Sequence, residues 1–380
     1  MRSANTNNYH RYDIDYIRVI AFGILILYHV AVFFEPGGWH IKNNITYREI
    51  LFPMIFINQW RLPILFVVSG MGTYFALGRR SGKQYAKERL KRLLLPFIVG
   101  VLFIVPPQVY IERLSQGVDY GGYFNFWPVN FFDGIYPTGN FSWHHLWFIL
   151  YLLIFSLVCL PLFLRLRKNS NGAFNRIIKK IIGSFGGILS LSIPLLIWRM
   201  LLSGNFPPNN GLVGDWFNLL YCVTFFIFGF ILVSSGEVFW DTVKKFRYTF
   251  LIIGLITYST LIYMWFGNFQ KTPIFDLVND TVQTLNVWVW ILCIFGFAAH
   301  HLNKSGAFLS YANETVYPFY ILHQTVIVIL GYYFWNLDMG FFVKFSLMVF
   351  LTFSITWIIY EYGICRYKIM RPLFGLKNKK

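Results

Sequence analysis

An arginine and a histidine in one apolar segment are the first residues whose types suggest chemistry. Arg18 and His29 are eleven positions apart, in a stretch where ionisable side chains are costly and therefore mark functional positions. On an α-helix this separation is a rise of about 16 Å and close to three full turns, so both side chains point the same way. We expect them to line one channel, with a cation at its mouth and a proton-accepting imidazole deeper inside.

A plainer interpretation of this pair stays open. His29 would then be a packing residue between helices, and Arg18 an anchor at the membrane surface.

A second pair of arginines has the spacing of one helix face. Arg89 and Arg92 are three positions apart in the stretch GRRSGKQYAKERLKRLLLP, directly before an apolar segment. Guanidinium groups match phosphate oxygens with paired hydrogen bonds, so together with Arg18 they would suit a polyanionic ligand. The alternative is an ordinary basic loop beside the membrane.

Histidines and aromatic residues near the ends of apolar segments form a third group of candidates. Imidazoles and aromatic rings combine an apolar body with a polar edge, which suits an uncharged, hydroxyl-rich ligand. The competing interpretation is the belt of aromatic residues found at membrane interfaces. The residues predicted to bind this substrate are Trp39, His40, His144, His145, Trp147, Tyr320 and His323. No His or Cys spacing is typical of zinc, so we predict no metal site and no tightly bound cofactor.

The elements that must position these residues are membrane-spanning helices. Of the 380 residues, 56% are hydrophobic and only 13% are charged, whereas a soluble domain has about 25% charged residues. This composition excludes a soluble globular enzyme, a disordered chain and a fibrous protein, and the apolar runs are too long for a β-barrel. We predict an all-α polytopic membrane protein with ten spans near residues 16–34, 50–77, 93–111, 144–164, 181–202, 215–233, 249–266, 280–301, 315–335 and 342–363.

The distribution of Lys and Arg predicts the orientation in the membrane. With ten spans both termini share one side, which carries 25 of the 33 Lys and Arg residues, against 4 on the opposite side. Because cytoplasmic loops are enriched in these residues, we expect a single multi-pass domain over residues 1–380 in the cell inner membrane, with cytoplasmic tails at 1–15 and 364–380. The net charge of +17 then reflects topology and attraction to the lipid bilayer rather than nucleic-acid binding.

Five segments, in order, resemble the membrane acyltransferase 3 family. They are Arg18 with His29, FVVSG (66–70), RLKR (89–92), HLWFILYLL (145–153) and YPFYILH (317–323). The segments DIDYIRVIAF, GGWHIKN and FPPNNG are further similar to its glucan biosynthesis branch, whose members resemble succinyltransferases of periplasmic glucans. The resemblance covers essentially the whole chain.

The resemblance implies an O-acyltransferase. Such a protein moves an acyl group from cytoplasmic acyl-CoA, its donor substrate, to a hydroxyl of a saccharide or glucan on the outer face. By position, His29 matches the family's catalytic histidine, and Arg18, Arg89 and Arg92 match its donor-binding residues. Succinyl-CoA and acetyl-CoA both remain open as donors, as do direct transfer with His29 as general base and an acyl-histidine intermediate. A homo-oligomer is compatible with the sequence.

The runner-up is a secondary transporter or flippase for a polar or saccharide substrate. Ion coupling needs ionisable residues near the membrane midplane, whereas Asp280 and Glu361 are the acids that we find near predicted spans, both close to span ends. A third hypothesis is a purely structural membrane scaffold, which leaves the aligned Arg18 and His29 unexplained.

Overall fold

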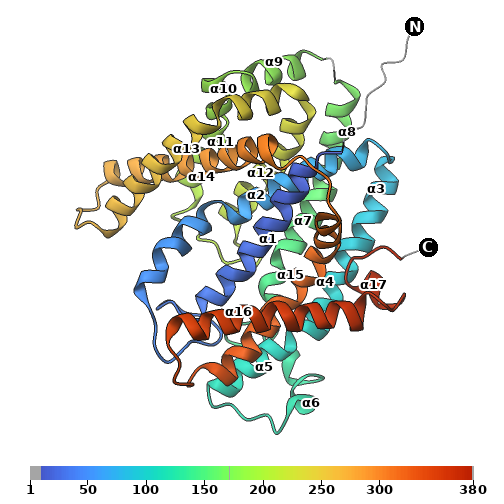
Figure 1. Ribbon diagram of the computed structural model, residues 1–380, viewed down its shortest axis with the longest axis vertical. Coiled ribbons are helices and arrows are strands. Elements are labelled where there is room, and N and C mark those ends of the chain that lie inside the picture. Colours follow the sequence, from blue (N-terminus) through green and yellow to red (C-terminus); the bar gives the residue numbers. More distant parts are fainter. Residues whose placement is uncertain (1–9, 171, 379–380) are drawn as a thin grey trace.

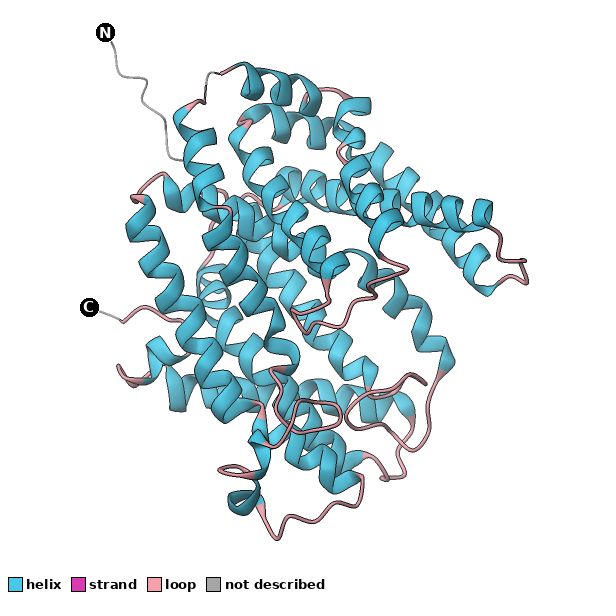
Figure 2. Cartoon of the chain, turned by 180° about the vertical axis from the view of Figure 1, so that it is seen from behind, coloured by secondary structure: helices cyan, strands magenta, loops and turns pink. Residues whose placement is uncertain are grey.

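The protein is an all-helical bundle. The computed structural model describes residues 10–170 and 172–378, and within these ranges the regular elements are helices, apart from one isolated bridge between Ile135 and Phe141 (Figures 1 and 2). Helices satisfy their own backbone hydrogen bonds, as a chain crossing lipid requires. The predicted fold class is therefore confirmed.

Nine helical units of the described chain are long and apolar enough to cross a membrane. Five units are single helices: α1 (Tyr12–Val32), α12 (Trp216–Ser234), α13 (Glu237–Phe266), α14 (Pro273–His301) and α15 (Ala307–Phe334). Two units extend one helix: Arg48–Leu77 contains α2 (Leu51–Leu77), and Phe341–Ile364 contains α16 (Phe341–Ile358). Two units join several helices: Gly82–Ser115 contains α3 (Gly82–Arg89), α4 (Leu95–Val99) and α5 (Pro106–Ser115), and Phe185–Leu202 contains α10 (Phe185–Ser190) and α11 (Ser192–Leu202). A tenth is formed if the bent pair of α7 (Trp147–Val158) and α8 (Leu160–Lys168), at 47°, counts as one span. The short helices are α6 (Tyr123–Phe126), α9 (Ala173–Ile182) and α17 (Met370–Leu373).

The predicted boundaries were too narrow at several charged ends. The third unit begins at Gly82, so Arg89 and Arg92 lie within it rather than before it, and it continues past residue 111 to Ser115. A predicted span ends where the hydropathy falls at charged residues, whereas the helix itself continues through those residues into more polar surroundings.

Both predicted tails contain helical residues. The N-terminal helix begins at Tyr12, inside the predicted tail 1–15, and α17 lies inside the predicted tail 364–380. Residues 1–9 and 379–380 of these tails lie outside the described part of the chain. The backbone of the second tail also bonds to the bundle, since the Gly375 carbonyl accepts a hydrogen bond of 3.1 Å from Arg92 Nε.

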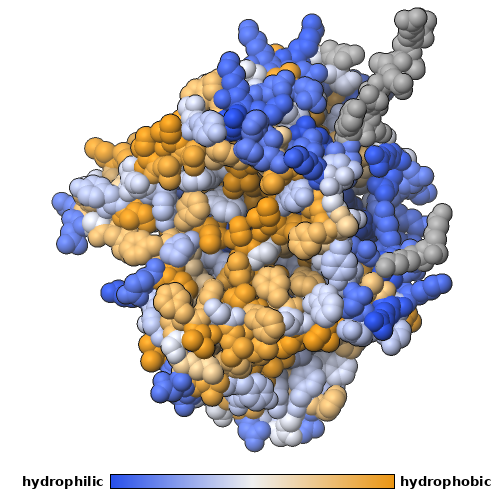
Figure 3. Space-filling model, in the orientation of Figure 1, coloured by the Kyte–Doolittle hydropathy of each residue, from blue (hydrophilic) through white to orange (hydrophobic). Residues whose placement is uncertain are grey.

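Apolar side chains cover much of the exterior. Figure 3 shows hydrophobic residues over much of one face, with hydrophilic residues concentrated toward its margins. Ile252 and Ile256 of α13 and Phe342 and Phe350 of α16 are among the exposed large side chains. Such a surface is unfavourable in water and suited to contact with lipid.

Glycines allow close packing at the centre of the bundle. Gly70 of α2 faces the Phe226 carbonyl of α12, and Gly229 of α12 faces the Val67 carbonyl of α2. A Cβ at either glycine would collide with the facing backbone, so these small residues permit the close approach of the two helices. The α2–α12 pair thereby forms a rigid wall beside α1, which also packs on α15 (Figure 1).

Candidate functional site

Two histidines from distant parts of the sequence form a hydrogen-bonded pair. Nε2 of His323 on α15 lies 3.0 Å from Nδ1 of His29 on α1. The other ring nitrogen of His323, Nδ1, lies 2.6 Å from the Tyr320 carbonyl and must donate a proton to it. In neutral His323 the Nε2 atom is then the acceptor, so His29 donates through Nδ1 and keeps an unprotonated Nε2. This network assigns His29 the tautomer of a base.

His29 opens into a large cavity lined by both polar and apolar side chains, which we name the histidine cavity. Its volume is about 1180 Å³. The predicted substrate-binding residues that line it are His40, His144, His145, Trp147 and Tyr320. His323 acts behind His29 instead of lining the cavity, and Trp39 packs beside the His40 ring, at 5.3 Å between ring centres, outside the lining.

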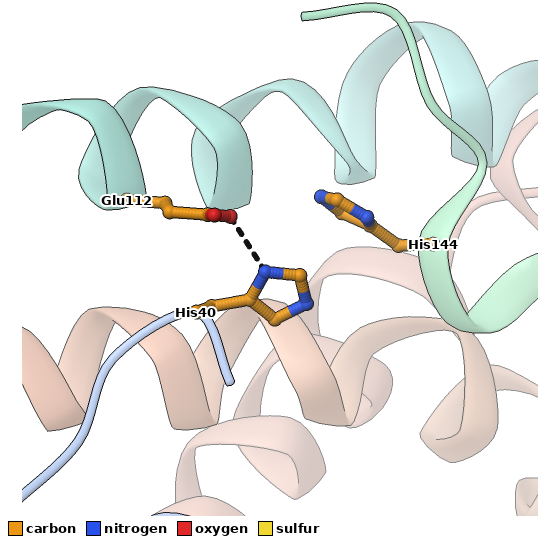
Figure 4. Close-up of side chains that lie close together, drawn as sticks. All are labelled: His40, Glu112 and His144. Carbon is orange, nitrogen blue, oxygen red and sulfur yellow. Dashed lines mark hydrogen bonds and ion pairs between the residues drawn. The ribbon is translucent and has the colours of Figure 1, made fainter. Parts of the chain in front are cut away.

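A buried carboxylate organises one wall of this cavity. Figure 4 shows Glu112 on α5 facing His40, which lies in a loop, and His144, which begins the 3-10 turn His144–Leu146 before α7. Nδ1 of His40 donates to Glu112 Oε2 at 2.6 Å, and the Tyr136 hydroxyl donates to Oε1 at 2.9 Å. Burial and the adjacent carboxylate together raise the pKa of Tyr136, which therefore remains a donor. The Gln324 amide, 3.1 Å away, donates to His40 Nε2.

Sequence reasoning missed Glu112. The predicted third span ended at residue 111, so this acid was counted as part of an outside loop, whereas it is 4% exposed in the helix. The claim that acids occur near spans only at Asp280 and Glu361 is therefore wrong.

His144 leaves a buried atom without a partner. Its backbone has a φ of 39°, in the left-handed region, and its Nε2 is buried without a hydrogen-bond partner among the described residues. His40, Glu112 and His144 offer ligand atoms within 4.8 Å of one another, which sequence spacing could not reveal because they come from three separate segments. The hydrogen bond between His40 and Glu112 accounts for the placement of both side chains without an ion. The Nε2 of His144 is thus a buried polar atom whose hydrogen bond the described residues do not supply.

His145 ties the entrance of α7 to α15. Its Nε2 donates to the Ile321 carbonyl at 3.0 Å, and the Tyr320 hydroxyl donates to the His145 carbonyl. These two bonds hold the His145 and Tyr320 side chains at the cavity wall. His145 is therefore a structural support as well as a lining residue.

The predicted basic residues meet in a second cavity, which we name the arginine cavity. Its volume is about 460 Å³, and its arginines include Arg18, Arg79, Arg80, Arg89 and Arg92. Arg18 bonds to Asp15 at 3.1 Å and to Asn313 at 2.8 Å, while Glu88 pairs with Arg80 at 3.0 Å. With Arg11 the lining has six guanidinium groups, which the Asp15 and Glu88 carboxylates do not balance, so the cavity favours an anionic ligand.

An aromatic layer separates the two cavities. The ring of Phe148 lines both of them, and its centre lies 6.2 Å from that of Phe22 and 5.8 Å from that of Tyr320. Arg18 and His29 therefore line different cavities, and the single channel predicted from their spacing is not formed in this structure. Helical periodicity placed both side chains on one face, but it could not show that rings from neighbouring helices fill the space between them.

Arg61 was also missed as a site residue. It lies in α2, is 8% exposed and lines the histidine cavity. The signal was present in the sequence, because an arginine in the middle of an apolar span is rare and is retained for a reason.

These features define a multi-pass membrane protein with a cavity on each side of an internal aromatic layer, one containing histidines and the other arginines. A family model described as an acyltransferase domain matches residues 11–361. The chain belongs to this family, acyltransferase 3, as the sequence motifs predicted.

Curated relatives agree with this assignment. The chain is 22% identical over 339 residues to proteins called "Glucans biosynthesis protein C" from Escherichia coli SMS-3-5, Shigella dysenteriae serotype 1 and Escherichia coli K12. The alignments cover 85% of this chain and 83% of each relative. No solved structure is a significant match. The protein is accordingly a membrane acyltransferase.

Proposed function

We propose that the protein transfers a succinyl or acetyl group from acyl-CoA in the arginine cavity to a hydroxyl of a saccharide or glucan in the histidine cavity. The observation that carries the proposal is the shared wall at Phe148, which puts a cationic cavity next to one lined by imidazoles. The printed name of the relatives supports a glucan as the acceptor. The protein lies in the cell inner membrane with both termini in the cytoplasm, so the arginine cavity opens to cytoplasmic acyl-CoA.

The donor's phosphates bind to the arginine cluster. Arg18 forms an ion pair with Asp15, and Arg92 forms one with Glu88. Nε of Arg89 is buried without a hydrogen-bond partner among the described residues. These groups are thus held in place while retaining donors for phosphate oxygens.

The donor's pantetheine arm crosses the aromatic layer. The rise of about 16 Å between Arg18 and His29 is within reach of an extended arm. Because Phe148 fills the space between the cavities, its ring moves aside when the thioester enters. Until then the layer keeps the thioester away from water in the histidine cavity.

His29 acts as the general base. Its free Nε2 removes the proton from the acceptor hydroxyl as that oxygen attacks the thioester carbon, and His323 holds the imidazole in the required tautomer. His144, whose Nε2 has no partner among the described residues, binds another hydroxyl of the acceptor, and His40, whose ring nitrogens contact Glu112 and Gln324, forms the wall beside it. Direct transfer needs no second nucleophile, and we therefore favour it over an acyl-histidine intermediate.

A transporter or flippase is the second candidate, and one observation favours it. Two cavities that meet at a closed layer also suit alternating access, and the buried Glu112 could carry a coupling proton. Transport would move the saccharide unmodified, whereas the proposed reaction leaves an ester on it.

The test uses the purified protein in lipid nanodiscs. Radiolabelled succinyl-CoA and acetyl-CoA are supplied with a panel of linear and cyclic glucans, and label in the glucan is measured. We expect acylated glucan from the wild type and from His301→Ala, a control histidine that lines neither cavity, but not from His29→Ala. Label transfer by no donor, together with counterflow of unmodified glucan in liposomes, would establish the transporter instead.

A further inference from the structure

A buried arginine in the histidine cavity has no acidic partner. Two arginines of the described chain are buried, Arg371 at 4% exposure and Arg61 at 8%. Arg371 pairs with Glu314 at 2.6 Å, as a buried cation normally must. Arg61 forms no ion pair with any residue in 10–170 or 172–378.

Uncharged neighbours hold the Arg61 side chain in one place. Its Nε and Nη2 donate to Asn58 Oδ1 at 3.2 and 3.0 Å, and its guanidinium lies over the Tyr28 ring, 3.7 Å from the centre. Stacking on an aromatic face stabilises a cation without neutralising it. The guanidinium is thus fixed in position with its full charge.

The position of Arg61 relative to the base is the second observation. Tyr28 precedes His29 in α1, and the two ring centres are 6.0 Å apart. Arg61 therefore reaches the same part of the cavity as the base, from α2 on the other side of Tyr28. Negative charge that forms on a substrate beside His29 forms within the field of this guanidinium.

We propose that Arg61 is a catalytic residue that stabilises the oxyanion of the acyl-transfer step. This inference rests on the proposed function. The acceptor oxygen forms a bond to the thioester carbon, its proton passes to His29 Nε2, and the carbonyl π electrons move onto oxygen. When this oxyanion collapses, the C–S bond breaks, the sulfur leaves with the electron pair and takes the proton from His29, and an ester and free CoA result.

Among the negatively charged groups that could lie beside Arg61, an oxyanion gains most from a guanidinium that is already fixed in place. A cation that is fixed in advance and sheltered from water gains most from charge that appears only in the transition state. A free carboxylate at the far end of an acyl chain would also attract Arg61, but only one of the two donor types carries such a group. The oxyanion forms with every acyl donor, and this difference makes the two roles separable.

The experiment compares Arg61→Met and Arg61→Lys with the wild type, using acetyl-CoA and succinyl-CoA at saturating glucan. We expect Arg61→Met to lower kcat by about 10²–10³-fold with both donors, the usual effect of removing an oxyanion donor. Acyl-CoA affinity, measured by calorimetry, should stay within about twofold of wild type, because the phosphates bind in the other cavity. Arg61→Lys retains the charge and should recover part of the kcat.

Arg167→Met is the matched control. Arg167 also lies against a tyrosine, 5.1 Å from the Tyr74 ring centre, but it lines neither cavity. Its kcat should remain within a few-fold of wild type. Because donor binding reports on folding independently of turnover, a misfolded Arg61→Met would be recognised, and Arg61→Lys would then carry the test through its kcat with the two donors.

Three results would overturn the inference. One is a loss confined to succinyl-CoA, which would make Arg61 a reader of the acyl carboxylate. Another is a raised KM for glucan with an unchanged kcat, and the third is wild-type turnover in both variants. In each case the wild type still acylates glucan, so the proposed function survives. Absence of transfer by the wild type itself would instead reject the proposed function.

Discussion

His323 Nε2 accepts a hydrogen bond from His29 Nδ1 over 3.0 Å, and this contact decides which nitrogen of His29 is free. His323 is completely buried and donates through its own Nδ1 to a carbonyl of its helix, so its Nε2 can only accept while the ring is neutral. In the proposed mechanism a histidine thus fills the orienting role that a carboxylate fills in the serine hydrolase triads. Unlike a carboxylate, it leaves the pair uncharged, which suits a site inside the membrane.

Replacement of His29 tests the base. His29→Ala should lower kcat by about 10²–10⁴-fold, the usual contribution of a positioned general base. Acyl-CoA affinity should not change, because His29 lies on the far side of the aromatic layer from the arginine cavity. Single-turnover transfer and calorimetry together measure both quantities. Activity within a few-fold of wild type would remove His29 from the mechanism.

Replacement of His323 tests the positioning role. His323→Phe keeps a ring in the buried site but cannot accept the proton of His29 Nδ1, so His29 can adopt either tautomer. We expect kcat to fall by about 10–10²-fold with the KM for glucan unchanged, in line with other residues that orient an active group. If His323 had a purely structural role, the variant would instead yield less folded protein, and the fraction that folds would have a normal kcat. His323→Gln should restore part of the activity, since its amide oxygen can accept the same hydrogen bond.

The sequence predicted the helices and placed Arg18 and His29 on one helix face, but it did not predict how neighbouring helices pack between and around them. Arg18 and His29 could be placed because helical periodicity relates residues of a single segment. The pairing of His29 with His323 joins residues 294 positions apart and depends on how α1 packs against α15, which no local pattern contains. Glu112 was lost for a different reason, since hydropathy cannot place the end of a span to within one residue.

Donor binding should depend on the arginine cavity. Arg89→Ala combined with Arg92→Ala should weaken acyl-CoA binding by at least about tenfold, because contacts between guanidinium groups and phosphate are charge-assisted. The effect should shrink as salt is raised, since salt screens such contacts. Calorimetric titration with acyl-CoA at two salt concentrations measures both. The matched control is Arg176→Ala with Lys179→Ala, basic residues of α9 that line neither cavity, and an equal loss there would assign the first pair to topology alone.

Acceptor binding should depend on His40. His40→Ala should raise the KM for glucan severalfold and leave acyl-CoA affinity unchanged, as expected for an interaction made equally in the ground and transition states. Glu112→Gln should give a smaller change of the same kind, because it weakens the bond that holds His40 in place. Initial rates over a range of glucan concentrations provide the measurement. If both variants lose donor affinity instead, the acceptor does not bind at this wall.

The aromatic layer should control where the thioester meets water. Phe148→Ala removes the ring that lines both cavities, so water and the thioester gain access to each other, and we expect acyl-CoA hydrolysis without glucan to rise at least about tenfold. Phe148→Trp adds bulk at the crossing point and should slow transfer while acyl-CoA still binds. Truncation of a buried Phe costs about 3–5 kcal/mol of stability in itself. Phe155→Ala, at another buried position of α7 that lines neither cavity, is therefore the control for packing loss. Free CoA release is followed with a thiol reagent. Equal hydrolysis in both alanine variants would attribute the leak to general loosening of the bundle, whereas hydrolysis confined to Phe148→Ala would identify this ring as the barrier between donor and acceptor.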